Sequence, residues 1–211
     1  MVLTGVTPLG DEIVLRPLGR GDRREFLDLR ARNASWLSPW DPTAPPGGAP
    51  RRDIAKDYGA YVRGMAAEAR SGAGLGLAIV VEDEIVGLVS ASGIVEGALR
   101  GCSIGYWVGQ EVAGRWIAPT AVAMIADHLM DPNGRALHRI QIEIIPENAP
   151  SLSVVRKLGL RDEGLRRDYL HINGRWRDHR SFAIVSEEIG PGGLMQRLSH
   201  QHQQSQPRHT E

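Results

Sequence analysis

The sequence predicts a mixed α/β domain in which helices cover the faces of one central β-sheet. Two kinds of segment alternate along the chain: short apolar runs typical of strands, and stretches whose apolar residues recur every three or four positions, as on a helix face. The 211 residues, 42% of them hydrophobic, suffice for one domain with a sizeable core. We expect this domain to span residues 1–186 and residues 187–211 to form a polar, flexible tail.

The first predicted elements are a strand at Glu12–Pro17 and a helix over residues 22–33 with an aspartate at its N-cap. The next segment, residues 35–50, holds five prolines and two glycines, which exclude regular structure. It also holds Trp36 and Trp40, and each indole must hide about 150–250 Å² of surface. We therefore expect an ordered loop that either packs on the body of the domain or forms one wall of a substrate site.

A second helix is predicted over residues 53–70, where apolar residues have helical spacing, and it ends in the glycine-rich segment 71–76. Two strands follow, Leu75–Val81 and Glu84–Ile94, joined by a tight turn. The next strand, Gly101–Val108, alternates with a period of two, as a half-buried strand does.

A third helix is predicted over residues 119–130, since it begins at a proline, which suits the first helical turn. The apolar strand Arg139–Ile145 and a short helix over residues 150–157 follow, and Gly159 is a favourable residue just beyond a helix. The predicted order is therefore β-α-α-β-β-β-α-β-α-β-β once the final hairpin is added.

The final hairpin consists of Leu160–Ile172 and Trp176–Val185 around the strong turn pair Asn173–Gly174. It is rich in arginine. Such stretches are mostly solvated faces, and docking to an acidic peptide or to ribosomal RNA is the alternative. The arginines concerned are Arg161, Arg166, Arg167, Arg175, Arg177 and Arg180.

The composition excludes several classes of protein. With 25 basic and 25 acidic side chains, the chain does not bind nucleic acid or anionic membranes by bulk charge. A single cysteine, Cys102, excludes an internal disulfide and a cysteine metal site, and His128 and His138 lack a second ligand at suitable spacing. No apolar stretch reaches the ~18–20 residues of a membrane helix, and no signal peptide is recognised, so we expect a cytoplasmic protein without a metal.

Four stretches carry a more specific pattern: Trp36–Trp40 (WLSPW), Ser103–Val108 (SIGYWV), Asn148–Leu160 (NAPSLSVVRKLGL) and Asp162–Asp178 (DEGLRRDYLHINGRWRD). Together with the element order, they resemble the Gcn5-related N-acetyltransferase (GNAT) superfamily. Within it they are similar to the branch of ribosomal-protein alanine N-acetyltransferases, the RimJ/RimL type. The resemblance covers about Glu12 to Val185.

The resemblance implies the GNAT fold, in which a splayed pair of parallel strands in a mixed sheet receives acetyl-CoA, with no metal. It implies transfer of the acetyl group to a protein N-terminal α-amine, as in ribosomal proteins, by direct attack in a ternary complex. The implied partner is a protein or peptide N-terminus rather than nucleic acid or a membrane, and the implied state is a monomer or homodimer.

The strand–loop–helix after Val108 is a typical anion site, because unpaired amides and the helix dipole favour negative charge. The resemblance places the CoA phosphates there. It also implies that the backbone of the preceding strand pairs with pantetheine, and that Asn148 and Ser151 contact the cofactor. The implied cofactor residues are Tyr106, Trp107, Val108, Ala113, Gly114, Arg115, Trp116, Ile117, Ala118, Pro119, Asn148 and Ser151.

One departure from the family pattern concerns the phosphate loop, which is Gln/Arg-x-x-Gly-x-Gly/Ala in the superfamily. Here Ala113 stands at the first polar position and Trp116 at the central glycine, where a backbone normally approaches a phosphate closely. An indole there must point away or the loop must open. Arg115 is expected to compensate as a charged phosphate contact.

Catalysis requires a base for the amine and a proton donor for the thiolate. Glu143 is the first candidate base: its apolar neighbours Ile142 and Ile144 place it on the opposite strand face, and the resemblance matches it to the catalytic glutamate of a related alanine acetyltransferase branch. The alternative is an exposed strand carboxylate. Glu163 is the second candidate, or else a structural hydrogen-bond acceptor. The resemblance assigns Ser151 to thiolate protonation, and a helix cap is its alternative.

The acceptor groove is expected to be lined by Trp36, Trp40, His171 and Trp176, and packing on the hairpin face is the alternative role for Trp176. Two other functions are kept open. One is acetylation of a small amine, such as a polyamine or an aminoglycoside, or of a protein lysine. The other is a non-catalytic CoA-binding or regulatory module whose phosphate loop is impaired by Trp116.

Overall fold

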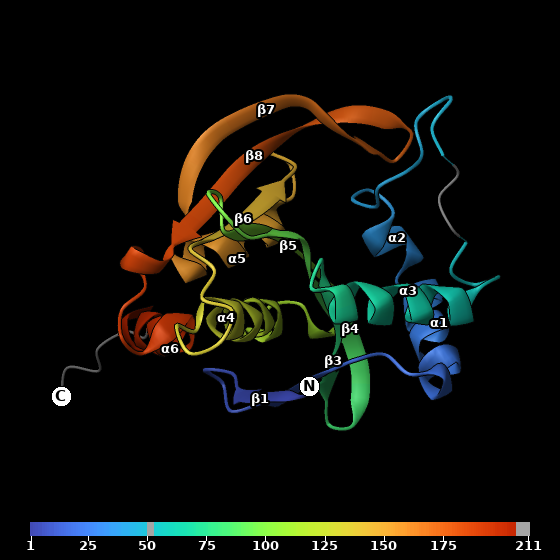
Figure 1. The fold of residues 1–211 in the computed structure, drawn as a ribbon. Coiled ribbons are helices and arrows are strands. Elements are labelled where there is room, and N and C mark those ends of the chain that lie inside the picture. The colour runs from blue at the N-terminus through green and yellow to red at the C-terminus, as the bar shows by residue number, and fades with distance from the viewer. Residues whose placement is uncertain (50–52, 206–211) are drawn as a thin grey trace.

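The computed structural model describes residues 1–49 and 53–205, which fold around one sheet (Figure 1). Within these residues the strand order is β1-β2-β3-β4-β5-β6-β8-β7. All neighbours pair antiparallel except β5 and β6, which are parallel. The predicted mixed α/β class is thus confirmed, with its single parallel pair in the middle of the sheet.

The strands agree closely with those expected from apolar periodicity, and one strand was not predicted. The short β1 pairs with β2 at one edge of the sheet. The strands are β1 Leu3–Val6, β2 Glu12–Arg16, β3 Leu75–Val81, β4 Glu84–Val95, β5 Gly101–Val108, β6 Arg139–Ile144, β7 Arg161–Ile172 and β8 Arg175–Val185.

The helices differ more from expectation, chiefly at their ends. Helix α3 starts at Tyr58 rather than near residue 53, because the Asp57 carboxylate accepts a hydrogen bond from the Ala60 amide and caps it. The helices are α1 Arg23–Arg32, α2 Ala34–Leu37, α3 Tyr58–Ser71, α4 Ile117–Met130, α5 Ala149–Leu158 and α6 Gly193–Ser205, with 3₁₀ turns at Arg20–Asp22, Gln110–Val112 and Ser186–Glu188.

The segment 35–50 does contain regular structure, which corrects the expectation. One helical turn, α2, holds Trp36 and Leu37 just before the first proline of the segment, so the prolines do not interrupt it. The rest runs as turns and extended chain to residue 49, and Pro50 lies outside the described residues.

Two apolar clusters fill the two faces of the sheet. One lies between the sheet and helices α4, α5 and α6, with Ile104, Ile125 and Val155 among its buried residues. The other joins Phe26 of α1 and Tyr58 of α3 to the opposite sheet face. Figure 1 shows α4 and α6 on the left of the sheet and α1 and α3 on the right. No helix in the described part of the chain is long and apolar enough to cross a membrane.

Helix α6 occupies a segment that we expected to lack regular structure. Leu194 and Leu198 are each only 1% exposed and belong to the larger core cluster. The Asp127 carboxylate of α4 accepts hydrogen bonds from the amides of Leu194 (2.7 Å) and Met195 (3.0 Å), which secures the start of α6. A polar composition concealed two leucines four residues apart, which share one helix face. The boundary at residue 186 and the flexibility beyond it stay predictions.

Candidate functional site

The parallel strands β5 and β6 separate after a short paired stretch. Pairing runs from Gly101 and Arg139 to Ser103 and Gln141, and β5 continues to Val108. Because β5 has its other edge on β4, the remainder of β5 offers one open backbone edge at this point. A polar chain that can accept and donate hydrogen bonds can pair with that edge as an added strand would.

We call the region where β5 and β6 separate the opening. The antiparallel register of β4 and β5 shows which backbone groups of β5 face it. The Gly109 amide donates to the Val86 carbonyl (2.8 Å), and bonded and non-bonded pairs alternate along β4 and β5. Trp107 therefore bonds to β4, and the N–H and C=O groups of Tyr106 and Val108 face away from it. The indole of Trp107 lies against Phe26 and Arg30 of α1 rather than in the opening.

Glu143 of β6 is the most unusual polar residue beside the opening. Its side chain is only 6% exposed, so it is not the solvated strand carboxylate considered as the alternative. Oε1 accepts a hydrogen bond from Ser181 Oγ (3.0 Å) and lies 3.5 Å from an Arg166 nitrogen, whereas the buried Oε2 has no partner within the described residues. A buried carboxylate oxygen without a protein partner is costly, and a catalytic role or a bound water or ion is the usual reason for one.

The position of three hairpin side chains around Glu143 was not predicted from the sequence. Ser181 stands directly opposite Glu143 in β8, and Arg166 of β7 stands opposite His179. His179 is 3% exposed, and burial lowers its pKa, so its ring is neutral near pH 7. The alternation of His179 and Ser181 is visible in the sequence, but the register that brings them to Glu143 is not.

Asn148 and Ser151 lie at the start of α5, next to β5. Asn148 is the N-cap, since its Oδ1 accepts a hydrogen bond from the Ser151 amide (3.1 Å). The capping role considered for Ser151 therefore belongs to Asn148. The Ser151 hydroxyl instead lies 2.8 Å from the Tyr106 hydroxyl, which brings the predicted proton donor to the predicted pantetheine strand.

The predicted phosphate loop leads into α4, which begins at Ile117 and not at Pro119. Pro119 is thus the third helical residue and has no N–H, so the free amides of this turn come from Ile117, Ala118 and the loop before them. Gly114 adopts a left-handed conformation with φ of 86°, and the space beside it is open. Ala113 is exposed and precedes the turn.

Arg115 does not point at the helix N-terminus. Its guanidinium forms ion pairs with Asp11, in the turn between β1 and β2, and with Glu82, in the turn between β3 and β4. Asp11 raises the pKa of the guanidinium. The side chain is thus engaged by these two carboxylates, and its contact with a phosphate stays a prediction.

Trp116 adopts the left-handed conformation, with φ of 64° and ψ of 4°, that the family glycine would adopt freely. Its indole packs between α5 and α6: Lys157 Nζ lies 4.0 Å from the ring centroid and the His202 ring meets it edge-on at 5.3 Å. Burial also lowers the pKa of Lys157. The backbone of the loop thus keeps the glycine-like course while the ring joins the core of α4, α5 and α6.

We expect Trp116→Gly to destabilise the fold by about 1–2 kcal/mol, because the lost packing of a half-buried indole exceeds the relief of left-handed strain. Urea unfolding measures this. CoA affinity by calorimetry should not rise. A clear gain in affinity would instead support the alternative in which the indole blocks the phosphate loop.

Of the residues predicted to line the acceptor groove, His171 and Trp176 lie side by side at the hairpin end, and Trp36 lies at the end of β5. Trp36 Nε1 donates to the Val108 carbonyl (3.1 Å), at the end of the open strand edge. Thr43 joins the hairpin through its amide to the His171 carbonyl (2.8 Å) and its hydroxyl to His171 Nδ1 (2.8 Å). Trp176 is 52% exposed beside His171, and Trp40 is half-buried after α2. The described part of the loop is therefore packed against the hairpin and β5.

The arginines of the hairpin mostly form ion pairs, which lowers its effective charge. Arg177 pairs with Glu147 (2.9 Å), and Arg180 pairs with Asp162. Arg161 and Arg166 are paired as well, and among the described residues Arg167 and Arg175 have no ion pair. A solvated face fits this arrangement better than a nucleic-acid surface.

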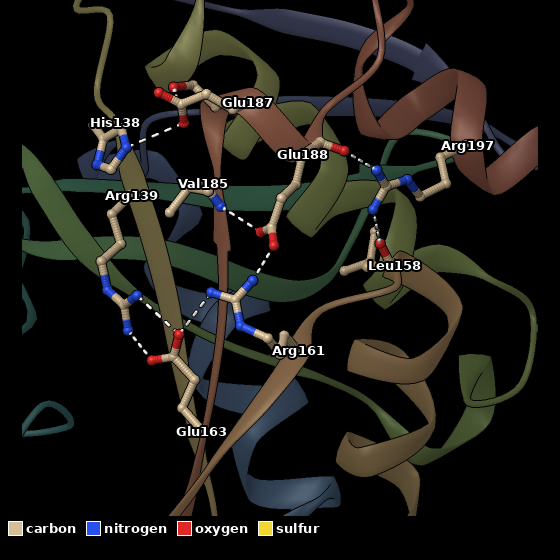
Figure 2. A network of polar contacts seen from close by, with 10 residues as sticks. His138, Arg139, Leu158, Arg161, Glu163, Val185, Glu187, Glu188 and Arg197 are labelled. Atoms are coloured by element: carbon tan, nitrogen blue, oxygen red, sulfur yellow. Dashed lines mark hydrogen bonds and ion pairs between the residues drawn. The ribbon is translucent and has the colours of Figure 1, made fainter.

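Glu163 is part of such a network at the base of the hairpin (Figure 2). Its carboxylate accepts hydrogen bonds from Arg139 (3.1 Å) and Arg161 (2.9 Å), and Arg161 also pairs with Glu188. The two arginines lower the Glu163 pKa to about 2. So strong an acid is a poor base near neutral pH, and the arrangement matches the structural acceptor considered as its alternative.

The same pKa predicts a pH dependence. The ion pairs of Glu163 stabilise the fold fully above about pH 4.5, the ordinary pKa of a glutamate, and this contribution is lost as the pH falls toward 2. We expect Glu163→Gln to lower the free energy of unfolding by on the order of 1 kcal/mol at pH 7, with the difference shrinking below pH 4.5. Urea unfolding at several pH values measures this, and a pH-independent difference would contradict it.

In the described part of the chain, no group of three or more histidine, cysteine or acidic side chains could hold a metal ion. The candidate groups here are the backbone edge of β5, the first amides of α4, the hydroxyl pair of Tyr106 and Ser151, and the buried carboxylate of Glu143. This set can bind an extended thioester and accept a proton beside it.

Comparison with known proteins gives concordant matches. The family model of the acetyltransferase (GNAT) domain matches residues 12–161. The ribosomal protein uS5-alanine N-acetyltransferase of Escherichia coli is 29% identical over 188 residues, covering 86% of this chain and 92% of that protein. Two solved structures share the fold. Mycobacterium smegmatis RimJ in complex with CoA-disulfide has a TM-score of 0.84 and 33% identity, covering 95% and 94% of the two chains. The ribosomal-protein-S5-alanine acetyltransferase of Vibrio fischeri has a TM-score of 0.73 and 25% identity, covering 85% of this chain and 96% of that chain.

Proposed function

The chain belongs to the GNAT acetyltransferase family, and on that premise we propose that it acetylates the N-terminal α-amine of a protein, of the ribosomal-protein type. It is an N-acetyltransferase with acetyl-CoA as its co-substrate. The relatives named for ribosomal-protein acetylation support the choice of acceptor, and we propose that the protein works in the cytoplasm. The observation that carries the proposal is the buried Glu143 carboxylate with its free oxygen beside the separated strands.

We place acetyl-CoA along the open edge of β5. The Tyr106 and Val108 backbone groups pair with the pantetheine amides. Asn148 Nδ2, for which no partner is seen in the described part of the chain, donates to the same arm. The loop amides and the first amides of α4 receive the pyrophosphate, where the helix dipole favours an anion. The indole of Trp116 lies between α5 and α6, so the loop backbone rather than a side chain makes this contact.

The acceptor amine attacks from the other side of the separated strands. An α-amine has a reference pKa of ~7.7–8 against ~10.4 for lysine, so it needs only modest help from a base. Glu143 Oε2 takes the proton, directly or through one water, as the amine nitrogen bonds to the thioester carbon. Backbone N–H groups of β5 stabilise the oxyanion. The C–S bond then breaks, and Ser151 gives its proton to the leaving thiolate and regains one from solvent.

The surroundings of Glu143 favour a peptide N-terminus over a polyamine. A polycationic acceptor would be expected to meet several carboxylates, whereas the groups beside Glu143 are Arg166, Ser181 and neutral His179. Trp36, Trp40, His171 and Trp176 would form the wall along which the peptide enters.

Acetyl transfer is tested by incubating the protein with acetyl-CoA and peptides that begin with Ala or Ser, while free thiol is followed. A matched peptide with a blocked N-terminus and an internal lysine is the control, and mass spectrometry locates the acetyl group. We expect thiol release only with a free N-terminus. Thiol release only with polyamines, aminoglycosides or the blocked peptide would overturn the proposed acceptor. No thiol release with any amine of a broad panel would overturn the proposed function.

A further inference from the structure

Tyr106 carries a phenol group that the mechanism above does not use. Its side chain leaves β5 on the face covered by α5, where it packs against the larger core cluster. The hydroxyl lies 2.8 Å from Ser151 Oγ and 3.2 Å from the Ser151 carbonyl oxygen. Burial raises the pKa of Tyr106, so the phenol stays neutral and able to donate.

The Ser151 hydroxyl needs such a partner if it is to act on sulfur. The hydroxyl of a serine near a helix start otherwise rotates among backbone acceptors. The Ser151 amide donates to Asn148 Oδ1, but this bond does not fix the orientation of the hydroxyl. A hydroxyl oxygen that accepts one hydrogen bond keeps its own proton for another acceptor. A neutral phenol that donates to Ser151 Oγ therefore leaves the serine proton free to point at the thiolate.

We propose that Tyr106 is a positioning residue for acetyl transfer: its hydroxyl donates to Ser151 Oγ and directs the serine proton toward the sulfur of CoA. The inference rests on the proposed function. Tyr106 itself neither gains nor loses a proton in the step. The phenol thereby links the open strand edge, which holds the thioester, to the helix that supplies the proton.

The test is a double-mutant cycle of Tyr106→Phe and Ser151→Ala, with kcat and the KM for acetyl-CoA measured against an N-terminal peptide. We expect Tyr106→Phe to lower kcat about tenfold with KM unchanged, as loss of one hydrogen bond predicts. Ser151→Ala should lower kcat about 100-fold. In the Ser151→Ala background, Tyr106→Phe should have no further effect, because nothing remains to be positioned.

Tyr58→Phe is the matched control. Tyr58 lies in α3, on the opposite face of the sheet, and the substitution removes one phenol hydrogen bond, which the Tyr58 hydroxyl donates to the Gly19 carbonyl (3.0 Å). It should leave kcat unchanged, and thermal melting shows that all variants are folded. Unchanged kcat in Tyr106→Phe, or equal losses with and without Ser151, overturns the inference alone. A wild-type protein that releases no thiol with any amine overturns the proposed function and the inference together.

Discussion

Replacing Glu143 with glutamine is expected to lower kcat about 100- to 1000-fold and leave the KM for acetyl-CoA nearly unchanged. Glutamine keeps the shape and the hydrogen bond from Ser181, but it cannot accept the proton of the amine. Steady-state kinetics with acetyl-CoA and an N-terminal peptide measure the effect. Because only the base is lost, cofactor binding measured by calorimetry should be the same in both proteins.

Glu147→Gln is the matched control. Glu147 is four residues away, and its side chain is 66% exposed and paired with Arg177. We expect this variant to keep most of its activity. If Glu143→Gln retained most of its kcat while Glu147→Gln lost it, the base would have been assigned to the wrong carboxylate.

The same substitution separates catalysis from stability. A buried carboxylate with one unpartnered oxygen destabilises the native state, so a neutral amide in its place should leave the urea midpoint unchanged or raise it. A catalytic loss together with equal or greater stability identifies a residue kept for chemistry. A fall in both would instead make Glu143 a structural partner of Arg166.

The position of Glu143 on its strand could be predicted from the sequence. Its apolar neighbours Ile142 and Ile144 face the helices, so period-two alternation places Glu143 on the opposite face. Its burial could not be predicted, since burial depends on Ser181 and Arg166. Those residues reach it through the pairing of β6 with β8 and of β8 with β7, which is set by contacts across the whole sheet.

Trp116 shows the same limit in the phosphate loop. Its place at a family glycine is evident from the sequence, which leaves open whether the indole points away or the loop opens; in the structure the indole contacts Lys157 and His202. The contacts themselves were not foreseen, because α6 was expected to be a tail. Local propensity is a weak signal for a helix of mostly polar residues, and tertiary packing decides its fate.

Removing residues 191–211 is expected to lower the free energy of unfolding by about 5 kcal/mol. The deletion exposes the core surface that Leu194 and Leu198 cover. It also removes the two amides that Asp127 accepts from, which leaves a carboxylate whose pKa burial already raises. Urea unfolding followed by circular dichroism measures the loss.

Point variants separate packing from the loss of chain. Leu198→Ala removes one fully buried side chain from α6 and should cost about 2–4 kcal/mol, whereas Gln203→Ala on the exposed side of the helix should change stability by less than about 0.5 kcal/mol. Since His202 contacts Trp116, the deletion should also loosen the phosphate loop and weaken CoA binding. A shortened protein with the urea midpoint and CoA affinity of the full chain would make α6 a mere appendage. The functional unit would then end near residue 186, as the composition of the chain alone predicts.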